Sequence, residues 1–366
     1  MSNPKNINIP KPRVLVAPLD WGLGHATRCI PIITELLQRE CEVIIAADGA
    51  INSLLRDEFP ALDFLPLFGY RIRYSKKKFF LPWNMILQLP KVTYAIYREH
   101  RWLKAIIKKH KIDAVISDNR FGMYNKIIPS IYITHQLLIK AANRFSENFL
   151  QHLHFYFINK YTKCWVPDFE KNELAGKLSH PVNIPQNVKY IGALSRFEKK
   201  KGDIEKRYDL LIMLSGPEPQ RTILEKKMLN DLTVYNGKAL LVRGLPGNDK
   251  NIRSKNASLE IINHLSGEEL NKAIQQSLMV ISRSGYTTIM DLIKLNKKAI
   301  LIPTPGQTEQ EYLADYLMKN KIFFSMQQKD FVLPKALDQS SRFASLLPEY
   351  DMLQYRSAVQ QFVQSL

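Results

Sequence analysis

Short apolar runs alternate with longer amphipathic stretches along most of this chain, which is the pattern of an α/β protein. In the first half, short stretches rich in apolar residues predict strands at residues 13–19, 41–48, 112–119, 129–136 and 189–196. A loop at 20–28 and a helix at 29–40 separate the first two of these strands. This order is a βαβ unit, and it predicts a parallel sheet.

The pattern restarts after a charged run at residues 198–207, which we interpret as a domain boundary. Further strands are predicted at 208–216, 239–245, 259–266, 278–285 and 299–305. We therefore expect Rossmann-like domains at 1–195 and 208–340, with closing helices at 341–366. Ligands of such open sheets bind beyond the carboxyl ends of the strands.

Length and composition support two packed domains. The chain has 366 residues, which is longer than one ordinary domain core requires. Hydrophobic residues make up 45% of it, as expected of a packed globular protein. Lys and Arg number 52 against 34 Asp and Glu, so the net charge is +18. This surplus suits an anionic partner, which is a membrane surface, a nucleic acid or an anionic substrate.

The cysteines and the apolar stretches bear on location. Cys29, Cys41 and Cys164 show no metal-binding spacing, and a sparse odd count fits a reducing compartment. The polar start of the chain shows no secretory signal, and the apolar stretch 81–97 is too interrupted to span a membrane. We expect a cytoplasmic protein that is soluble or peripheral to the membrane.

The strongest candidate site is the segment ISRSGYTTIMDL at 281–292. Ser284 and Gly285 place backbone N–H groups at a predicted helix start, where the helix dipole favours a phosphate. Asp291 follows about two helical turns later and suits two hydroxyls of a ribose. Gln310 and Glu311, at the head of the next helix, suit another polyol. The plain alternative is a pair of ordinary βα turns, but the combination favours a nucleotide-sugar site.

The first half contains candidate residues for proton transfer. His25 follows Gly22 and Gly24, whose lack of a side chain allows positive φ and close approach of a ligand. A neutral histidine suits a general base, and the alternative is a residue that only shapes the loop. Asp118 follows a strand and suits either orientation of His25 or, as we favour at this stage, a helix cap. His135 suits acceptor contact and a structural role equally.

These motifs resemble the GT-B glycosyltransferases, especially family 28, whose best-known member transfers N-acetylglucosamine from UDP to the lipid intermediate of peptidoglycan. The resemblance rests on WGLGH at 21–25, RSG at 283–285 and the segment 302–314. It implies two Rossmann-like domains facing each other across a cleft. It also implies a UDP-linked donor and a lipid-linked or envelope glycan acceptor.

The resemblance assigns further residues to the donor. Arg283, Ser284 and Gly285 match the family's turn, Asp291 its ribose ligand, and Gln310 with Glu311 its sugar-binding Gln pair. Leu265 in HLSGEEL matches a contact to the base, and Ser215 with Gly216 matches the phosphate loop. Gly22, Gly24 and His135 are implied on the acceptor side. The sequence has no Asp-x-Asp motif, so we expect no metal and no cofactor.

Two aromatic segments remain. Residues 71–111 alternate basic residues with the aromatic residues Phe79, Phe80, Trp83, Tyr94, Tyr97 and Trp102. Rings at headgroup depth with lysines on anionic lipid would explain this mix, so we expect peripheral membrane contact here. The alternative is a pair of core helices, which we favour for residues 144–165.

Three functions remain open from the sequence. A nucleotide-sugar glycosyltransferase accounts for the most motifs. A UDP-sugar 2-epimerase shares the two-domain architecture and needs no acceptor. A basic nucleic-acid-binding protein is suggested by charge alone, and we expect no nucleic-acid partner because no compact recognition motif is present.

Overall fold

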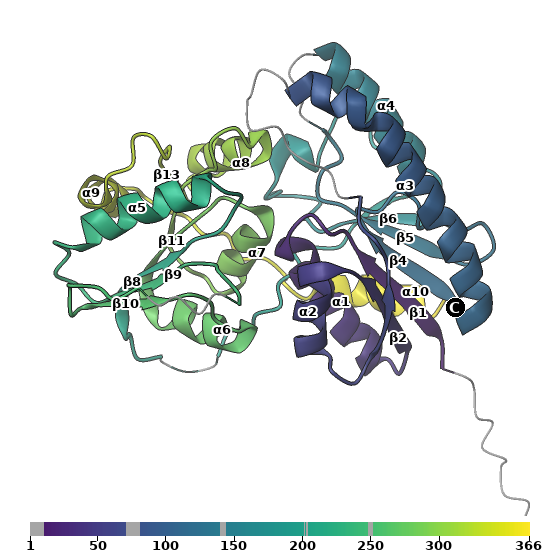
Figure 1. Cartoon of the computed structure of the whole chain (residues 1–366), viewed down its shortest axis with the longest axis horizontal. Helices are drawn as coiled ribbons and strands as arrows, with labels where there is room; N and C mark the ends of the chain where they lie inside the picture. The colour runs from purple at the N-terminus through teal and green to yellow at the C-terminus, as the bar shows by residue number, and fades with distance from the viewer. Residues whose placement is uncertain (1–10, 71–80, 140–143, 201, 203, 248–251) are drawn as a thin grey trace, which may run out of the picture. The chain divides into compact units, whose positions relative to one another are not determined.

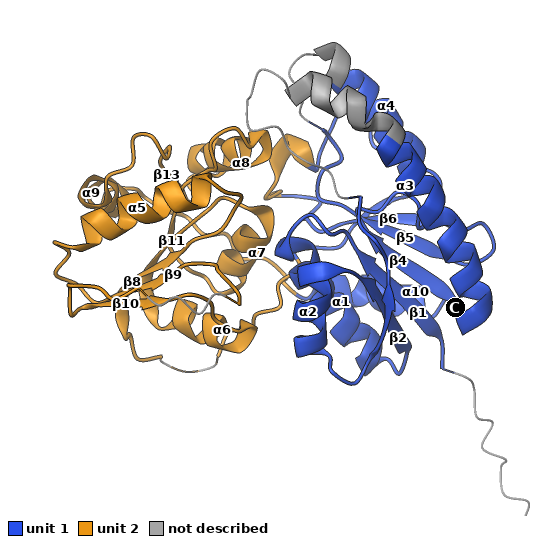
Figure 2. Ribbon diagram, viewed as in Figure 1, with its two compact units in different colours: residues 1–171, 179–193, 353–366 blue, residues 172–178, 194–352 orange. Residues whose placement is uncertain are grey.

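The computed structural model describes residues 11–70, 81–139, 144–200, 202, 204–247 and 252–366, with the backbone alone described at 81–90 and 144–146. The chain forms two compact units (Figure 2). Unit 1 comprises residues 1–171, 179–193 and 353–366, and unit 2 comprises residues 172–178 and 194–352. The chain thus enters unit 2 briefly at 172–178 and returns to unit 1 with its last helix.

Unit 1 is built on seven parallel strands in the order β3-β2-β1-β4-β5-β6-β7 (Figure 1). Its strands are β1 (Arg13–Pro18), β2 (Glu42–Ala47), β3 (Asp63–Pro66), β4 (Ala114–Asp118), β5 (Ser130–Ile133), β6 (Lys163–Val166) and β7 (Val188–Tyr190). Its helices are α1 (Leu23–Gln38), α2 (Gly49–Glu58), α3 (Leu81–His110), α4 (Arg144–Ile158) and α10 (Gln354–Val363). The strand order reverses between β1 and β4, which is where such sheets bind ligands.

Both faces of this sheet are covered, which explains why its central strands are apolar throughout. Alternate residues of β1 point to opposite faces. Leu15 packs in a cluster with Leu103 of α3, while α1 lies against β1 and β2. Tyr132 of β5 packs in a second cluster with Ile158 of α4. The last helix, α10, contacts α1 and so completes unit 1.

Unit 2 repeats the architecture with six parallel strands in the order β10-β9-β8-β11-β12-β13. Its strands are β8 (Tyr208–Met213), β9 (Ala239–Val242), β10 (Leu259–Ile262), β11 (Ser277–Ser282), β12 (Ala299–Leu301) and β13 (Phe324–Ser325). Its helices are α5 (Gln220–Leu232), α6 (Gly267–Gln275), α7 (Tyr286–Lys294), α8 (Thr308–Lys319) and α9 (Leu333–Ser341). Here the order reverses between β8 and β11.

Local sequence explains several boundaries in unit 2. Ser266 and Glu269 form a capping box that begins α6, each side chain accepting from the other residue's backbone N–H. Asn296, just after α7, has φ +50°, a left-handed conformation in which asparagine commonly ends a helix. Leu224 and Met228 of α5 and Ala336 of α9 join one core cluster against the sheet.

The predicted class, two parallel α/β domains, is confirmed, but some predicted elements were wrong in extent. Residues 189–196 were predicted as a strand, and only Val188–Tyr190 is one. The first helix begins at Leu23 and not at residue 29, so His25 lies in its first turn. The predicted domain boundary at 198–207 lies a few residues after the observed change of unit, between 193 and 194.

Of the two aromatic segments, residues 81–110 form α3 and residues 144–158 form α4, whereas the end of the second segment enters β6. Residues 71–80, with Phe79 and Phe80, lie outside the described residues, as does the side chain of Trp83. In the rest of α3, Tyr94 and Tyr97 are exposed and Trp102 packs on the core. In α4, which we predicted as core, Phe149 and Tyr156 are exposed whereas Ile158 is buried. Among the described residues, no helix is long and apolar enough to cross a bilayer.

Candidate functional site

The candidate residues of each unit gather at the carboxyl ends of the strands beside the reversal of strand order. In unit 1, the loop after β1 leads into α1, Asp118 ends β4, and His135 lies two residues beyond β5. The register pairs Pro18 with Asp118 and Asp118 with Ile133, so these ends lie side by side. In unit 2, the corresponding segments follow β8, β11 and β12. We describe each group by itself.

We call His25, Arg28, Asp118 and His135 the N-terminal cluster. Gly22 is the N-cap of α1 with φ +128°, a conformation that suits glycine, and it caps the helix with no side chain. His25 and Arg28 are three residues apart and therefore lie on the same face of α1. Arg28, which the sequence analysis missed, is the residue that joins the other three.

Arg28 holds Asp118 with two parallel hydrogen bonds. Its Nε lies 2.5 Å from Asp118 Oδ2, and its Nη2 donates to Asp118 Oδ1. Its Nη1 lies 3.0 Å from His135 Nδ1. Both Arg28 and Asp118 are fully buried, and such fork geometry is the strongest form of this ion pair. The pair fixes the start of α1 against the ends of β4 and β5.

The charges in this cluster set the protonation of its members. Burial would raise the pKa of Asp118, but the Arg28 guanidinium and His25 outweigh it and lower the pKa to about 2. Burial, followed by the Arg28 charge, lowers the pKa of His25 below its usual value, against the opposing effect of Asp118. Asp118 is therefore ionised and His25 is neutral at pH 7.

The hydrogen bonds also bear on the tautomers. An arginine only donates, so His135 accepts at Nδ1. His25 Nδ1 lies 3.1 Å from Asp118 Oδ1 and 2.7 Å from Arg28 Nη2. A proton on Nδ1 is held by Asp118 and leaves Nε2 as an acceptor, which is the tautomer that a general base requires. A proton on Nε2 lets Nδ1 accept from Arg28 instead.

In unit 2, three strand ends bring the predicted donor residues together. Ser215 and Gly216 follow β8 and are exposed, and Gly216 has φ +98°. Ser284 and Gly285 follow β11, and Gly285 is the N-cap of α7 with no side-chain cap. The Ser284 hydroxyl donates to the Gln310 carbonyl over 2.8 Å, so it ties this turn to α8. A phosphate here would therefore bind the backbone N–H groups at the N-terminus of α7, because the Ser284 hydroxyl already donates to Gln310.

Among the described residues, Arg283 forms no ion pair with an acidic side chain. Its guanidinium is buried and donates to the carbonyl oxygens of Ile302, Pro303, Gln220 and, at 3.5 Å, Ser215. Burial lowers its pKa to about 10, which leaves it charged at pH 7. Direct pairing with a diphosphate would break these bonds. Arg283 instead holds the three strand ends together and places a positive charge beneath them.

Gln310 and Glu311 shape the turn between β12 and α8. Gln310 Oε1 accepts from the Thr304 N–H at 3.0 Å, and its Nε2 donates to Gln307 over 2.6 Å. Glu311 Oε1 accepts from the Gly306 N–H at 2.8 Å. Gln310 therefore uses its oxygen and one N–H for the turn, and Glu311 uses one oxygen. The second N–H of Gln310 and the other oxygen of Glu311 are the groups that suit a sugar.

Asp291 lies on α7, at the end of the site where we predicted a ribose. Its Oδ1 accepts from the Ser195 hydroxyl at 2.6 Å. Burial of the carboxyl group raises its pKa to about 7, although the Ser195 hydrogen bond and the nearby Arg196 charge lower it. Asp291 is thus poised between its neutral and ionised forms near physiological pH, as functional carboxyl groups often are.

The remaining assignments are structural placements. Leu265 is half-buried in the loop between β10 and α6, directly before the Ser266 cap.

The sequence analysis did not predict two residues of these sites, Arg28 and Ser195. The i, i+3 spacing of His25 and Arg28 would have pointed to Arg28 once a helix was predicted from residue 23. Nothing local marked Ser195, because its partner lies 96 residues away.

Comparison with known proteins agrees with the geometry. Residues 244–358 match the glycosyltransferase family 28 C-terminal domain. No curated protein matches the chain. Among solved structures, the chain resembles the glycotransferase of kitacinnamycin, with a TM-score of 0.64 and 13% identity over 97% of this chain and 96% of that one.

Two other solved structures cover nearly the whole chain. MurG of Acinetobacter baumannii has a TM-score of 0.56 and 13% identity, over 98% of this chain and 100% of that one. The spinosyn rhamnosyltransferase SpnG, complexed with thymidine diphosphate, has a TM-score of 0.59 and 14% identity, over 96% of this chain and 95% of that one. These likenesses show the fold, and together with the family 28 domain they favour a transferase over the epimerase and nucleic-acid alternatives.

Proposed function

We propose that this family 28-like glycosyltransferase of the GT-B fold moves a sugar from a UDP-linked donor to a lipid-linked or cell-envelope glycan. The observation that carries the proposal is the convergence in unit 2 of the Ser215–Gly216 loop, the N-terminus of α7 with Gly285 as its N-cap, and Asp291. A phosphate-binding end and a ribose-binding carboxyl on one short helix suit a nucleoside diphosphate. An N-acetylhexosamine is our proposed sugar.

In this proposal, groups of unit 2 bind the diphosphate and the sugar of the donor. The diphosphate lies at the N-terminus of α7, where the helix dipole stabilises negative charge. As the glycosidic bond breaks, charge grows on the leaving diphosphate, and preorganised amides with the buried Arg283 charge stabilise it. This arrangement requires no metal ion. Gln310 Nε2 and Glu311 Oε2 bind hydroxyls of the sugar.

The N-terminal cluster of unit 1 serves the acceptor. His25 Nε2 removes the proton of the acceptor hydroxyl as that oxygen attacks the anomeric carbon, a role that suits a neutral imidazole. Asp118 holds the Nδ1 proton and so keeps Nε2 free to act. Arg28 neutralises Asp118, which prevents the pKa of His25 from rising. Gly22, Gly24 and His135 border the place that this proposal gives to the acceptor.

Calorimetric titration of the purified protein with UDP, TDP and GDP tests the donor assignment. We expect UDP to bind most tightly and with the same affinity in EDTA. Radiolabelled UDP-sugars incubated with a bacterial lipid extract would then reveal the labelled product. A protein that binds none of these nucleotides would refute the proposal, and a changed UDP-N-acetylglucosamine without acceptor, seen by NMR, would indicate the epimerase.

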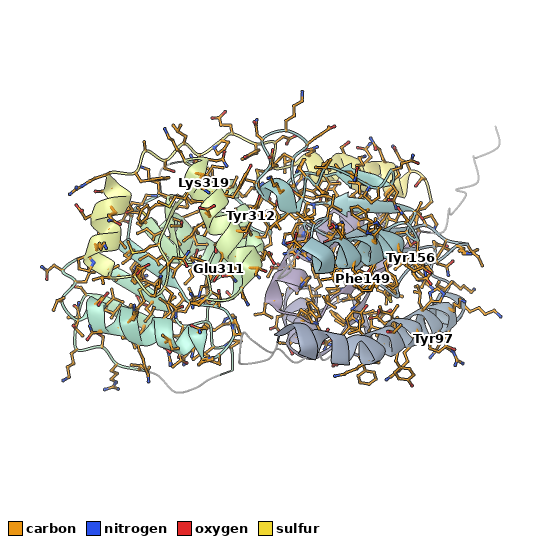
Figure 3. The ribbon with its side chains drawn as sticks, turned by 90° about the horizontal axis from the view of Figure 1, so that it is seen from above. Tyr97, Phe149, Tyr156, Glu311, Tyr312 and Lys319 are labelled. Atoms are coloured by element: carbon orange, nitrogen blue, oxygen red, sulfur yellow. The ribbon has the colours of Figure 1, made fainter. Side chains whose placement is uncertain are left out.

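We propose further that unit 1 contacts the cytoplasmic face of an anionic membrane. Tyr94 and Tyr97 of α3 are exposed, with the guanidinium groups of Arg98 and Arg101 about their rings at 5.9 and 5.8 Å from the ring centres. Figure 3 shows Tyr97 projecting from its helix, and the labels of Phe149 and Tyr156 mark exposed rings of α4. Exposed rings beside basic groups suit the headgroup region.

Sedimentation with lipid vesicles tests this contact. We expect the protein to bind phosphatidylglycerol vesicles and to dissociate from them at high salt. It should not bind phosphatidylcholine vesicles. The double variant Tyr94→Ser with Tyr97→Ser should bind several-fold more weakly. Val234→Ser, which removes an exposed apolar side chain from unit 2, is the matched control. Equal sedimentation of wild type and double variant would contradict the proposed surface.

A further inference from the structure

A short connecting segment, residues 194–197, lies against α7 of unit 2 beside the carboxyl group that we assign to the ribose. The Leu194 N–H donates to Met290 Sδ over 3.2 Å. The Ser195 hydroxyl donates to Oδ1 of the next residue on α7, Asp291, over 2.6 Å. Leu194, Ser195 and Phe197 are all buried. Ser195 is therefore held between buried neighbours, and its hydroxyl has a fixed place on α7.

The hydrogen bond between Ser195 and Asp291 has a defined direction. A serine hydroxyl carries one proton, and the Phe197 N–H donates to Ser195 Oγ over 3.2 Å. Ser195 thus accepts from Phe197 and donates its one proton to Asp291. Hydrogen bonds to an ionised carboxylate are stronger than those to a neutral group, so this contact favours the ionised form of Asp291.

Ser195 also orients the carboxyl group of Asp291. Rotation of a carboxyl group about its Cβ–Cγ bond is broad and roughly two-fold, so an unrestrained carboxylate exchanges the places of its two oxygens. Here Oδ1 is bonded to Ser195, whereas Oδ2 has no hydrogen-bond partner among the described residues. Asp291 is half-buried, and its Oδ2 retains surface that a ligand can reach. One carboxylate oxygen is thus left for a ligand in a defined direction.

The charges around Asp291 come from the same segment and its neighbours. Arg196 follows Ser195, and its charge opposes the burial that raises the pKa of Asp291 to about 7. Lys294 lies three residues further along α7 and pairs with Glu198 at 3.9 Å. His264, after β10, experiences the charge of Arg196, which lowers the pKa of its imidazole. Ser195 and Arg196 therefore both favour ionised Asp291, against the effect of its burial.

We propose that Ser195 is a positioning residue for the nucleotide: it holds Asp291 so that Oδ2 accepts a hydroxyl group of the donor ribose. A ribose hydroxyl can donate to this oxygen, whereas a phosphate would be repelled by it. Ser195 does not touch the donor and acts through Asp291. This inference rests on the proposed function, and it makes the segment 194–197 part of the donor site.

The variant Ser195→Ala tests this role by calorimetry with UDP, both alone and combined with Asp291→Asn. At pH 7 the alanine variant should bind UDP about 10-fold more weakly than wild type, because its carboxyl group is less ionised and no longer oriented. In the Asp291→Asn background the same substitution should change UDP affinity by less than about twofold, since the group through which Ser195 acts is gone.

Ser277→Ala is the matched control. Ser277 is a buried serine at the start of β11 in the same unit, and its hydroxyl donates to the Ala273 carbonyl over 2.6 Å. Strand β11 carries the donor residues at its other end, so this variant loses a buried hydrogen bond away from the site. It should bind UDP as wild type does.

The pH dependence of UDP binding gives a second readout, which does not depend on how much of a variant is folded. In wild type, the affinity should rise around pH 7 as Asp291 ionises. Loss of the Ser195 hydrogen bond raises the pKa of Asp291 further, so the rise should be centred at a higher pH in the alanine variant. A serine with a merely structural role would lower the affinity without moving this midpoint.

The possible results separate this inference from the proposed function. If wild type binds UDP and the alanine variant keeps the wild-type affinity or the wild-type midpoint, Ser195 does not act through Asp291. An equal loss of affinity in both backgrounds would also overturn its role. If wild type binds no nucleoside diphosphate, the proposed function fails together with this inference.

Discussion

Asp291→Asn is expected to weaken UDP binding by about 10-fold or more and, at the same time, to stabilise the ligand-free protein above pH 7. The first effect follows because a carboxylate that accepts ribose hydroxyls loses its charge, and hydrogen bonds to charged groups are the stronger ones. The second follows because the carboxyl is costly to ionise where it lies. The amide oxygen of asparagine still accepts from Ser195, so the local structure should persist.

The pH dependence has a definite sign. The pKa of Asp291 is raised to about 7 from an ordinary value of 3.8, so the folded state holds a proton that the unfolded state has released. Its contribution to the free energy of unfolding is therefore present below pH 4, declines as the pH rises to about 7, and is absent above that. The asparagine variant lacks this decline. UDP affinity of wild type should rise over the same range, because the ionised form binds the ribose.

Urea unfolding and UDP titration at pH 5, 6, 7 and 8 would measure both effects on one protein sample. Asp338→Asn is the matched control, since Asp338 is an exposed residue of the same unit that pairs with Arg342 four residues on. Two results would contradict the assignment. One is a variant with wild-type UDP affinity, and the other is a variant whose unfolding curve keeps the wild-type dependence on pH.

His25→Gln should lower kcat by about 10²- to 10⁴-fold, which is the usual contribution of a general base. Glutamine keeps a side chain that hydrogen-bonds to Asp118 or Arg28 but cannot take a proton. UDP affinity should remain unchanged, because the donor binds to unit 2. His152→Gln is the control, since His152 is an exposed histidine of α4 in the same unit.

The pH profile at saturating donor separates His25 from Asp291. Burial and the Arg28 charge lower the pKa of His25, so kcat should hold constant down to a pH below the ordinary histidine value of about 6.5 and then fall. The donor Kd should instead weaken already as the pH drops through about 7, following Asp291. A histidine variant that retains wild-type kcat, or an acid limb of kcat above pH 6.5, would count against His25 as the base.

The apolar runs of the sequence were sufficient to predict the two parallel sheets. Strands such as RVLVAP and YDLLIM are buried on both faces, and that burial leaves a continuous apolar signal. Three short strands gave no such signal and were missed: β3, with residues DFLP, β6, with residues KCWV, and the two-residue β13. The helix start at Leu23 was missed because two glycines precede His25, and glycine usually indicates a loop.

The sequence by itself therefore determined the architecture and the strand ends near which Asp118 and Ser284 lie, because side-chain periodicity and turn residues are local properties of the chain. Only the tertiary structure decided the partners of the buried polar groups. Arg28 meets Asp118 across 90 residues, and Ser195 meets Asp291 across 96. Such partners depend on which strand ends become neighbours where the sheet order reverses, and no local pattern encodes that.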